Sequence, residues 1–121
     1  MASTEVIVET NHGSFKLALD AEKAPKTVEN FLRYVDKKHY DGTVFHRVIA
    51  TFMVQGGGYD EAYTKRPTEP PVENEADNGL QNVRGSVAMA RTGDPHSATA
   101  QFFVNVVDNE FLNFKSKDQR G

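Results

Sequence analysis

The sequence predicts a small, mainly β domain with one clear helix. Two segments rich in apolar and β-branched residues flank a turn near the N-terminus, short apolar runs follow along the chain, and one stretch has helical periodicity. A length of 121 residues, of which 38% are hydrophobic and 26% charged, suits one globular domain. We therefore expect residues 1–121 to form a single domain.

The first predicted element is a β-hairpin. Residues 5–10 are rich in β-branched side chains, and in residues 15–19 apolar and other side chains alternate as in a half-buried strand. Between them lies Asn11-His12-Gly13, which has the composition of a hairpin turn. The two segments should therefore pair with each other.

The helix is expected to begin at Pro25, a residue that suits the first helical position. Apolar side chains then recur at the i, i+3, i+4 and i+7 positions, namely Val28, Phe31, Leu32 and Val35. Lys37 and Lys38 favour the C-terminal end of the helix dipole. We expect Asp41-Gly42 to close the helix.

Further short apolar runs are predicted to be strands, at residues 44–49, 52–55, 86–90 and 102–107. Between Gly56 and Val83 the pattern stops, because this stretch holds three prolines, several acidic residues and no sustained periodicity. A connection of this length in a compact domain is usually functional or disordered. Since proline restricts the backbone, we expect an ordered loop wrapped over the domain.

Composition excludes several classes of function. The chain has no cysteine, which excludes disulfides, a thiolate nucleophile and thiolate metal ligands. A net charge of −3 and a sequence pI near 5.8 give no electrostatic case for binding nucleic acid or an anionic membrane. The N-terminus does not have the pattern of a secretion signal, and no segment approaches the roughly 18 apolar residues of a membrane span. A cytoplasmic protein with no nucleic-acid and no membrane partner is expected.

Three short motifs suggest chemistry but carry weak signals. Gly56-Gly57-Gly58 matches neither phosphate-binding glycine pattern, so we interpret it as a tight turn that needs positive φ. The four histidines have no zinc-site spacing and are interpreted as structural or surface residues, namely His12, His39, His46 and His96. No nucleophile-elbow motif surrounds Ser97, which follows His96.

The most informative residue is Arg47, within the segment FHRVIATFMVQGGG at residues 45–58. A charged side chain in an apolar segment is rarely buried unless it is paired. Arg47 therefore either forms an internal ion pair with one of the 17 acidic residues or faces a cleft and acts on a bound molecule. If the two halves of the segment form a hairpin, strand alternation brings Arg47 near Met53 and Gln55. Phe52 would then face away unless it lies in the turn.

A second informative segment, SVAMARTGDPHSATAQFFVNVVDNEFLN, spans residues 86–113. Neighbouring side chains on a strand point to opposite faces. One of Phe102 and Phe103 can therefore fill the core while the other lines a surface, although simple core packing of both remains an alternative.

The blocks FHRVIATFMVQGGG and AMARTGDPHSATAQFFVNV together resemble the two signature blocks of the cyclophilins, the peptidyl-prolyl cis–trans isomerases. The similarity extends over NHGSFKLALD, APKTVENF and NEADNGLQNVRGSVAMAR, in a version closest to short cytoplasmic bacterial cyclophilins. The resemblance implies a closed barrel of eight antiparallel strands with two capping helices and a substrate groove on its outer wall. It also implies that two strands, a second helix and a further pocket residue follow Gly121, so that the domain is C-terminally incomplete.

The resemblance implies an enzyme that rotates X-Pro bonds and assists protein folding, with no cofactor and no metal. It makes Arg47 the catalytic arginine. The residues implied to bind substrate are Phe52, Met53, Gln55, Ala90, Arg91, Gln101, Phe103, Phe111 and Leu112. Arg91 stands where eukaryotic relatives commonly have asparagine, Phe111 where tryptophan is frequent, and Ala50-Thr51 where the family usually has a glycine.

The partners that the resemblance implies are unfolded or flexible polypeptides containing proline. Weak binding of the cyclic peptide inhibitor cyclosporin is also expected, because phenylalanine at position 111 lacks the N–H donor of tryptophan. The alternative function is a non-catalytic module or holdase that binds proline-containing segments.

Overall fold

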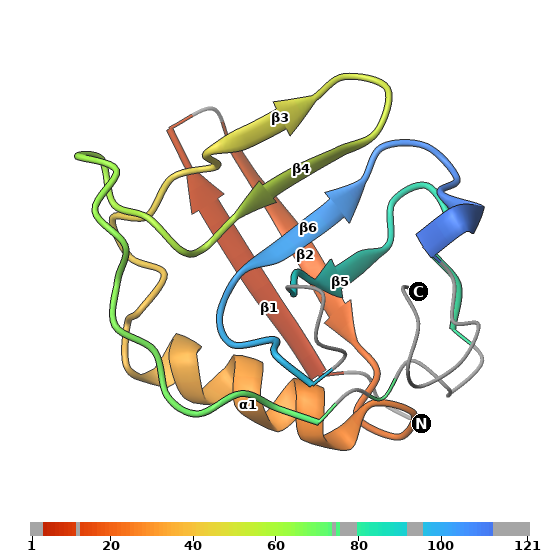
Figure 1. Cartoon of the computed structure of the whole chain (residues 1–121), viewed down its shortest axis with the longest axis horizontal. Helices are drawn as coiled ribbons and strands as arrows, with labels where there is room; N and C mark the ends of the chain where they lie inside the picture. Colours follow the sequence, from red (N-terminus) through yellow and green to blue (C-terminus); the bar gives the residue numbers. More distant parts are fainter. Residues whose placement is uncertain (1–3, 12, 74, 76–79, 92–95, 113–121) are drawn as a thin grey trace.

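The computed structural model describes residues 4–11, 13–73, 75, 80–91 and 96–112, which form two antiparallel sheets and one α-helix (Figure 1). The mainly β fold predicted from the sequence is confirmed. The elements, in chain order, are β1 (Thr4–Thr10), β2 (Gly13–Leu19), α1 (Pro25–Asp36), β3 (Arg47–Ile49), β4 (Met53–Gly56), β5 (Val87–Met89), β6 (Phe102–Asn105) and the 3₁₀ helix η2 (Glu110–Leu112).

The predicted N-terminal hairpin is confirmed. β1 and β2 pair from Thr4↔Leu19 to Thr10↔Gly13, and Gly13 has a φ of 118°, a conformation that glycine adopts without steric cost. His12 lies outside the described residues. The other four strands form a second sheet in the order β3-β4-β6-β5. All of its pairings are antiparallel.

The core lies between the two sheets and α1. In Figure 1 the β1–β2 hairpin passes behind the four-stranded sheet, and α1 runs along their lower edge. Phe102 of β6 is 4% exposed and meets the rings of Phe31, Tyr40 and Phe45 edge-on at centroid distances of 5.7, 5.6 and 6.0 Å. Edge-to-face aromatic pairs each contribute about 0.5–1.5 kcal/mol beyond the area that they bury. This cluster fixes β6 against the helix.

The predicted helix is confirmed, but the predicted closure at Asp41-Gly42 is wrong. α1 ends at Asp36, where the N–H of Lys37 donates to the carbonyl of Arg33. Lys38 then adopts a left-handed conformation with a φ of 59°, which turns the chain out of the helix. Gly42, with a φ of 78°, belongs to the turn that follows.

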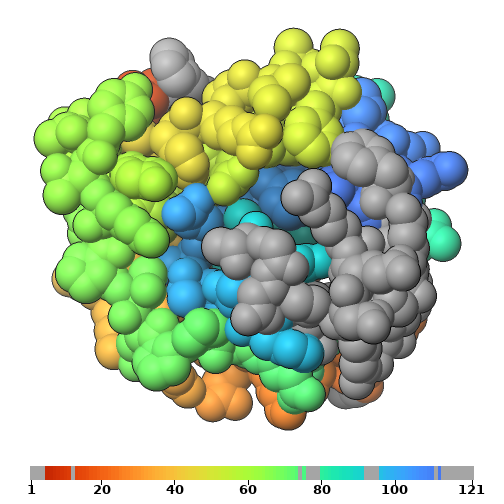
Figure 2. Space-filling view, in the orientation of Figure 1, coloured from red at the N-terminus to blue at the C-terminus, as the bar shows by residue number. Residues whose placement is uncertain are grey.

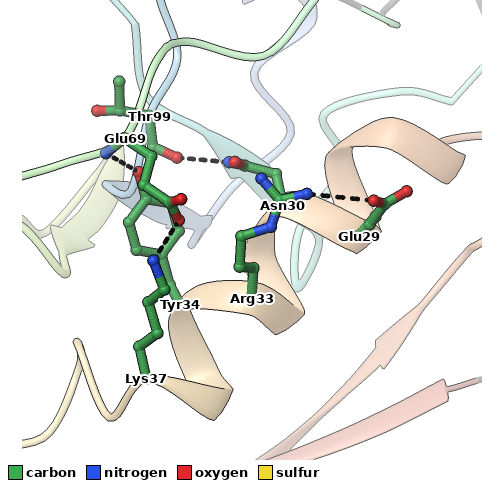
Figure 3. Close-up of polar contacts among 7 residues, drawn as sticks. All are labelled: Glu29, Asn30, Arg33, Tyr34, Lys37, Glu69 and Thr99. Carbon is green, nitrogen blue, oxygen red and sulfur yellow. Dashed lines mark hydrogen bonds and ion pairs between the residues drawn. The ribbon is translucent and has the colours of Figure 1, made fainter.

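The sequence predicted that the proline-containing loop is ordered and wraps over the domain, and its described part does lie against the helix. We call residues 57–73 the strap. Figure 3 shows Tyr34 of α1 and Lys37, the residue that follows the helix, reaching Glu69 of the strap. The hydroxyl of Tyr34 accepts the backbone N–H of Glu69 at 2.9 Å, and Nζ of Lys37 lies 3.1 Å from a carboxylate oxygen of the same residue. Within the described residues, no helix is long and apolar enough to cross a membrane.

The beginning of α1 is held from the other end of the same loop. Ala24, at the N-cap, offers no side-chain acceptor. Instead the carboxylate of Glu75 accepts the backbone N–H groups of Lys26 and Thr27 at 3.2 and 2.7 Å. A carboxylate at this position satisfies two orphan donors and complements the helix dipole.

Candidate active site

The segment around Arg47 forms the predicted hairpin. β3 and β4 pair with Arg47 opposite Gln55 and Ile49 opposite Met53. The connection is a tight turn in which the N–H of Phe52 donates to the carbonyl of Ile49 at 2.9 Å. Phe52 therefore lies in the turn. On a strand, alternation would make Phe52 face away from Arg47, so the turn is the one position that allows Phe52 to lie near Arg47.

The turn also explains why Ala50-Thr51 fits where a glycine was expected. The only described non-glycine residues with positive φ are Lys38 and Tyr63, so neither Ala50 nor Thr51 needs the left-handed conformation. A β-branched threonine is compatible with such a turn.

One register row crosses the whole four-stranded sheet. Arg47 lies opposite Gln55, Gln55 opposite Phe103, and Phe103 opposite Ala88. Side chains of directly paired residues project from the same face, so this row shares one face of the sheet. Phe102 projects from the opposite face into the core and Phe103 does not, which confirms the predicted division of the two rings.

Arg47 itself is exposed. No carboxylate in the described part of the chain forms an ion pair with it, so the ion-pair alternative has no support there. The neighbouring His46 packs against the ring of Tyr59 at 4.7 Å. Burial, and then the charge of Arg47, lower the pKa of His46, which keeps that imidazole neutral near pH 7.

The second sequence block joins this face through Gln101. Nε2 of Gln55 donates to Oε1 of Gln101 at 2.8 Å, and the N–H of Ala90 donates to the carbonyl of Gln101 at 2.9 Å. Arg91 follows Ala90 and is half-buried. The hydrogen bonds thus bring Gln55, Ala90 and Gln101 together from three separate segments.

Gly56-Gly57-Gly58 was interpreted as a tight turn that needs positive φ, and the triplet does contain a positive-φ glycine. Only Gly57 has positive φ, at 92°. At Gly56 and Gly58 the reason for glycine is close approach. A Cβ on Gly56 would lie 2.7 Å from the ring of Phe45, and one on Gly58 would lie 2.5 Å from the side chain of Gln101.

The remaining candidate residues lie around the β3–β4 turn and η2. Met53 is 3% exposed and projects from the same face as Gln55. The N–H of Leu112 donates to the carbonyl of Asn109, whose side chain in turn donates to the carbonyl of Phe52. Phe111 belongs to η2, and its side chain lies outside what the structure describes.

Sequence reasoning missed three residues at this site: Ala88, Asn105 and Asn109. Ala88 completes the register row next to Phe103 and gave no signal of its own. Asn105 and Asn109 are buried amides within and just after the apolar run at 102–107. A polar residue in an apolar run is the signal that could have identified Asn105, because buried polar groups need hydrogen-bond partners.

The surface of this face is hollowed. In Figure 2 the atoms of β6 (blue) lie deeper than those of the neighbouring β3–β4 hairpin (yellow to olive). Among the described residues, no three His, Cys, Asp or Glu side chains are grouped closely enough to hold a metal ion. The chemical groups that line the face are a guanidinium, two amides and apolar side chains.

A family model described as cyclophilin type peptidyl-prolyl cis-trans isomerase matches residues 5–117. The chain belongs to the cyclophilin family. This cyclophilin is 59% identical over 116 residues to peptidyl-prolyl cis-trans isomerase cyp18 of Streptomyces antibioticus, covering 96% of this chain and 70% of the relative. It is 53% identical over 116 residues to peptidyl-prolyl cis-trans isomerase B of Escherichia coli, with 96% and 71% covered. The family and these relatives place it among the peptidyl-prolyl cis–trans isomerases.

Solved cyclophilins share its fold. A Cryptosporidium parvum cyclophilin-type isomerase, with a crystal structure in the presence of the dipeptide Ala-Pro, superposes with a TM-score of 0.81 at 29% identity. That comparison covers 91% of this chain and 72% of the other. A cyclophilin from Hirschia baltica gives a TM-score of 0.77 at 27% identity, over 88% and 59% of the two chains.

Proposed function

We propose that this cyclophilin catalyses rotation about X-Pro bonds of flexible polypeptides on the face that carries Arg47, Gln55 and Phe103. The register row that places these three side chains on one face carries the proposal. It combines a permanent cation, an amide and an aromatic ring without a nucleophile. Rotation about an amide bond needs no nucleophile.

The reaction is limited by resonance in the prolyl amide. Partial double-bond character gives the C–N bond a rotational barrier of about 18–20 kcal/mol. In the twisted transition state the resonance is lost and the prolyl nitrogen regains a lone pair. A donor directed at that lone pair makes an interaction that the planar ground state does not offer, and such interactions accelerate a reaction.

Arg47 is the donor in this proposal. Its guanidinium is always protonated, is exposed, and forms no ion pair with a carboxylate of the described residues. It is therefore free to donate an N–H to the prolyl nitrogen as the bond twists. When a peptide is bound between Arg47 and the apolar side chains beside it, water is excluded and this hydrogen bond is strengthened.

The remaining residues of the face divide into two roles. The apolar group holds the proline ring, with Met53 as the floor and the others as walls: Phe52, Phe103, Phe111 and Leu112. The polar group holds the backbone on either side of the proline: Gln55, Ala90, Arg91 and Gln101. The Ala-Pro dipeptide named for the solved Cryptosporidium cyclophilin supports a proline-containing peptide as the ligand.

The finer architecture and the cellular role are part of the same proposal. The six described strands form two antiparallel sheets, and we propose that they belong to the closed eight-stranded barrel that the family resemblance implies. We also propose proline-containing clients, a role in protein folding and a cytoplasmic location, as the family resemblance implies. Cyclosporin should occupy the same face, weakly.

The direct test is exchange NMR spectroscopy on a short Ala-Pro peptide with substoichiometric protein. Catalysis predicts cis–trans exchange cross-peaks at mixing times of less than one second, whereas uncatalysed isomerisation takes tens of seconds or longer. Peptide resonances that shift without accelerated exchange would indicate the alternative, a module that binds proline segments without isomerising them. If the peptide resonances neither shift nor show accelerated exchange, the proposal is contradicted.

A further inference from the structure

Asn109 lies in the short connection between β6 and η2 and is buried. Asn109 is 3% exposed. Its Nδ2 donates to two acceptors, the carbonyl of Phe52 at 2.9 Å and Oδ1 of Asn105 at 2.8 Å. An amide nitrogen carries two hydrogens, so both donors are used. A second bond, from the N–H of Val106 at 3.2 Å, reaches the same carbonyl of Phe52.

Further hydrogen bonds extend this network and anchor Asn109. Nδ2 of Asn105, a residue 1% exposed, donates to Oδ1 of Asn82 at 3.1 Å and to Oγ of Ser86 at 3.0 Å. The backbone N–H of Asn109 donates to the carbonyl of Asn82 at 2.8 Å. Buried polar networks with satisfied donors fix one arrangement of the segments that they join. Here those segments are the 82–86 turn, the end of β6 and the β3–β4 turn.

Asn109 also fixes the start of η2. Its carbonyl accepts the N–H of Leu112 at 3.0 Å. The same residue therefore holds Phe52 through its side chain and Leu112 through its backbone. Both residues are among those proposed above to line the proline pocket.

We propose that Asn109 is a positioning residue that sets the separation of the two walls of the proline pocket. This inference rests on the proposed function. Asn109 touches no substrate and acts through the Phe52 carbonyl and the first turn of η2. Its loss should loosen the pocket around the proline ring while Arg47, held by the register of β3 and β4, stays in place. Binding should therefore weaken more than the rate on the bound peptide.

The experiment compares peptide affinity and bound-state exchange for the wild type and two variants. Asn109→Leu keeps the approximate size of the side chain and removes both donors, and Asn109→Ser is a smaller and milder change. NMR titration with an Ala-Pro peptide gives the dissociation constant, and line-shape analysis gives the exchange rate on the enzyme. We expect the dissociation constant to rise about tenfold in Asn109→Leu, with a bound-state rate within about twofold of wild type. The amide resonances of Met53 and Leu112 should shift.

Tyr34→Phe provides the matched control. Tyr34 is 2% exposed, and Tyr34→Phe also removes one partly buried hydrogen bond, which the N–H of Glu69 donates to the hydroxyl on the helix side of the core. It should lower stability and leave peptide affinity within about twofold of wild type. An Asn109→Leu protein with wild-type affinity, or with a loss no larger than that of Tyr34→Phe, would overturn the inference.

The remaining outcomes are also decisive. If both Asn109 variants are unfolded at 5 °C, Asn109 is a folding residue and the inference fails. If the bound-state rate falls in proportion to affinity, Asn109 does more than space the walls, and the inference is wrong as stated. A wild-type protein that binds the peptide without accelerating exchange would remove the proposed function but leave the affinity comparison intact.

Discussion

Gln55 donates from Nε2 to Oε1 of Gln101 at 2.8 Å and so joins β4 to the segment that leads into β6. The bond fixes the orientation of Gln101, and Gly58 leaves the space that this orientation needs. A side chain held in this way is already ordered before a peptide binds, which reduces the entropic cost of binding.

Gly58→Ala should therefore weaken peptide binding through Gln101. The new Cβ would lie 2.5 Å from Cγ and Nε2 of Gln101 and 2.6 Å from Cδ, so the side chain must move away from Gln55. Gly58 has no positive φ, so the backbone itself accepts alanine. We expect a three- to tenfold loss in affinity, that is, about 0.6–1.4 kcal/mol, measured by titration with an Ala-Pro peptide.

Gly13→Ala is the control for that variant. At Gly13 a Cβ would meet no described atom within 4 Å apart from its chain neighbours, but the φ of 118° strains any L-residue. It should destabilise the protein by about 1–2 kcal/mol and leave affinity unchanged. Equal affinities in wild type and Gly58→Ala would show that Gln101 does not contact the peptide.

Because Glu75 caps α1, we expect its loss to change the stability of the protein, and the prediction concerns stability only. Glu75→Ala leaves the N–H groups of Lys26 and Thr27 without their acceptor and should cost about 1 kcal/mol in the free energy of unfolding. Chemical denaturation measures it. Glu29→Ala removes only an exposed i,i+4 pair with Arg33, shown in Figure 3, and should cost no more than about 0.5 kcal/mol. Similar costs for both variants would show that the cap does not form.

The stability of the protein should fall as pH falls below about 6.5, the ordinary pKa of histidine. Burial, and to a lesser extent the charge of Arg66, lower the pKa of His39, although its bond to the Gly57 carbonyl opposes the shift. Because the folded pKa lies below the unfolded pKa, the unfolded state binds more protons in this range. The stability that the lowered pKa of His39 contributes is thus fully present above pH 6.5, and it is lost as the pH falls through the pKa of His39 in the folded state.

Thermal melts between pH 5.5 and 7.5 test this. The melting temperature should drop toward pH 5.5 in the wild type, and the drop should be smaller in His39→Gln, which does not titrate. Parallel curves for the two proteins would mean that His39 has an ordinary pKa in the folded state.

Cyclosporin affinity tests the assignment of Phe111. Phenylalanine lacks an N–H donor, so an acceptor of the inhibitor enters the groove unpaired at a cost of about 1–3 kcal/mol. Phe111→Trp should therefore tighten cyclosporin binding by about ten- to a hundredfold, with little change in turnover. Inhibitor titration of both proteins decides this, and equal affinities would place position 111 outside the groove.

The face of the candidate site could be predicted from local sequence because strand alternation and a tight turn act over short distances. Arg47 and Gln55 are eight positions apart, and a short hairpin leaves few registers that place both on one face. The same reasoning separated Phe102 from Phe103. The position of Phe52 was left open because alternation fails inside a turn.

Contacts between distant segments could not be predicted in this way. Glu69 and Glu75 bind α1 across sequence separations of 35 and 48–49 residues, and nothing in local periodicity links them. The helix end at Asp36 was missed because Lys38, not a glycine, takes the left-handed conformation. Gly58 has its role through Gln101, a contact that only the folded chain creates.

Arg47 should act on the transition state and not on the bound ground state, and exchange NMR on an Ala-Pro peptide with Arg47→Ala and wild type measures this. In Arg47→Ala we expect a roughly hundredfold or greater fall in the exchange rate on the bound peptide, with a dissociation constant within about threefold of wild type and an unchanged fold. Equal losses in affinity and rate, or a wild-type rate without Arg47, would contradict this role.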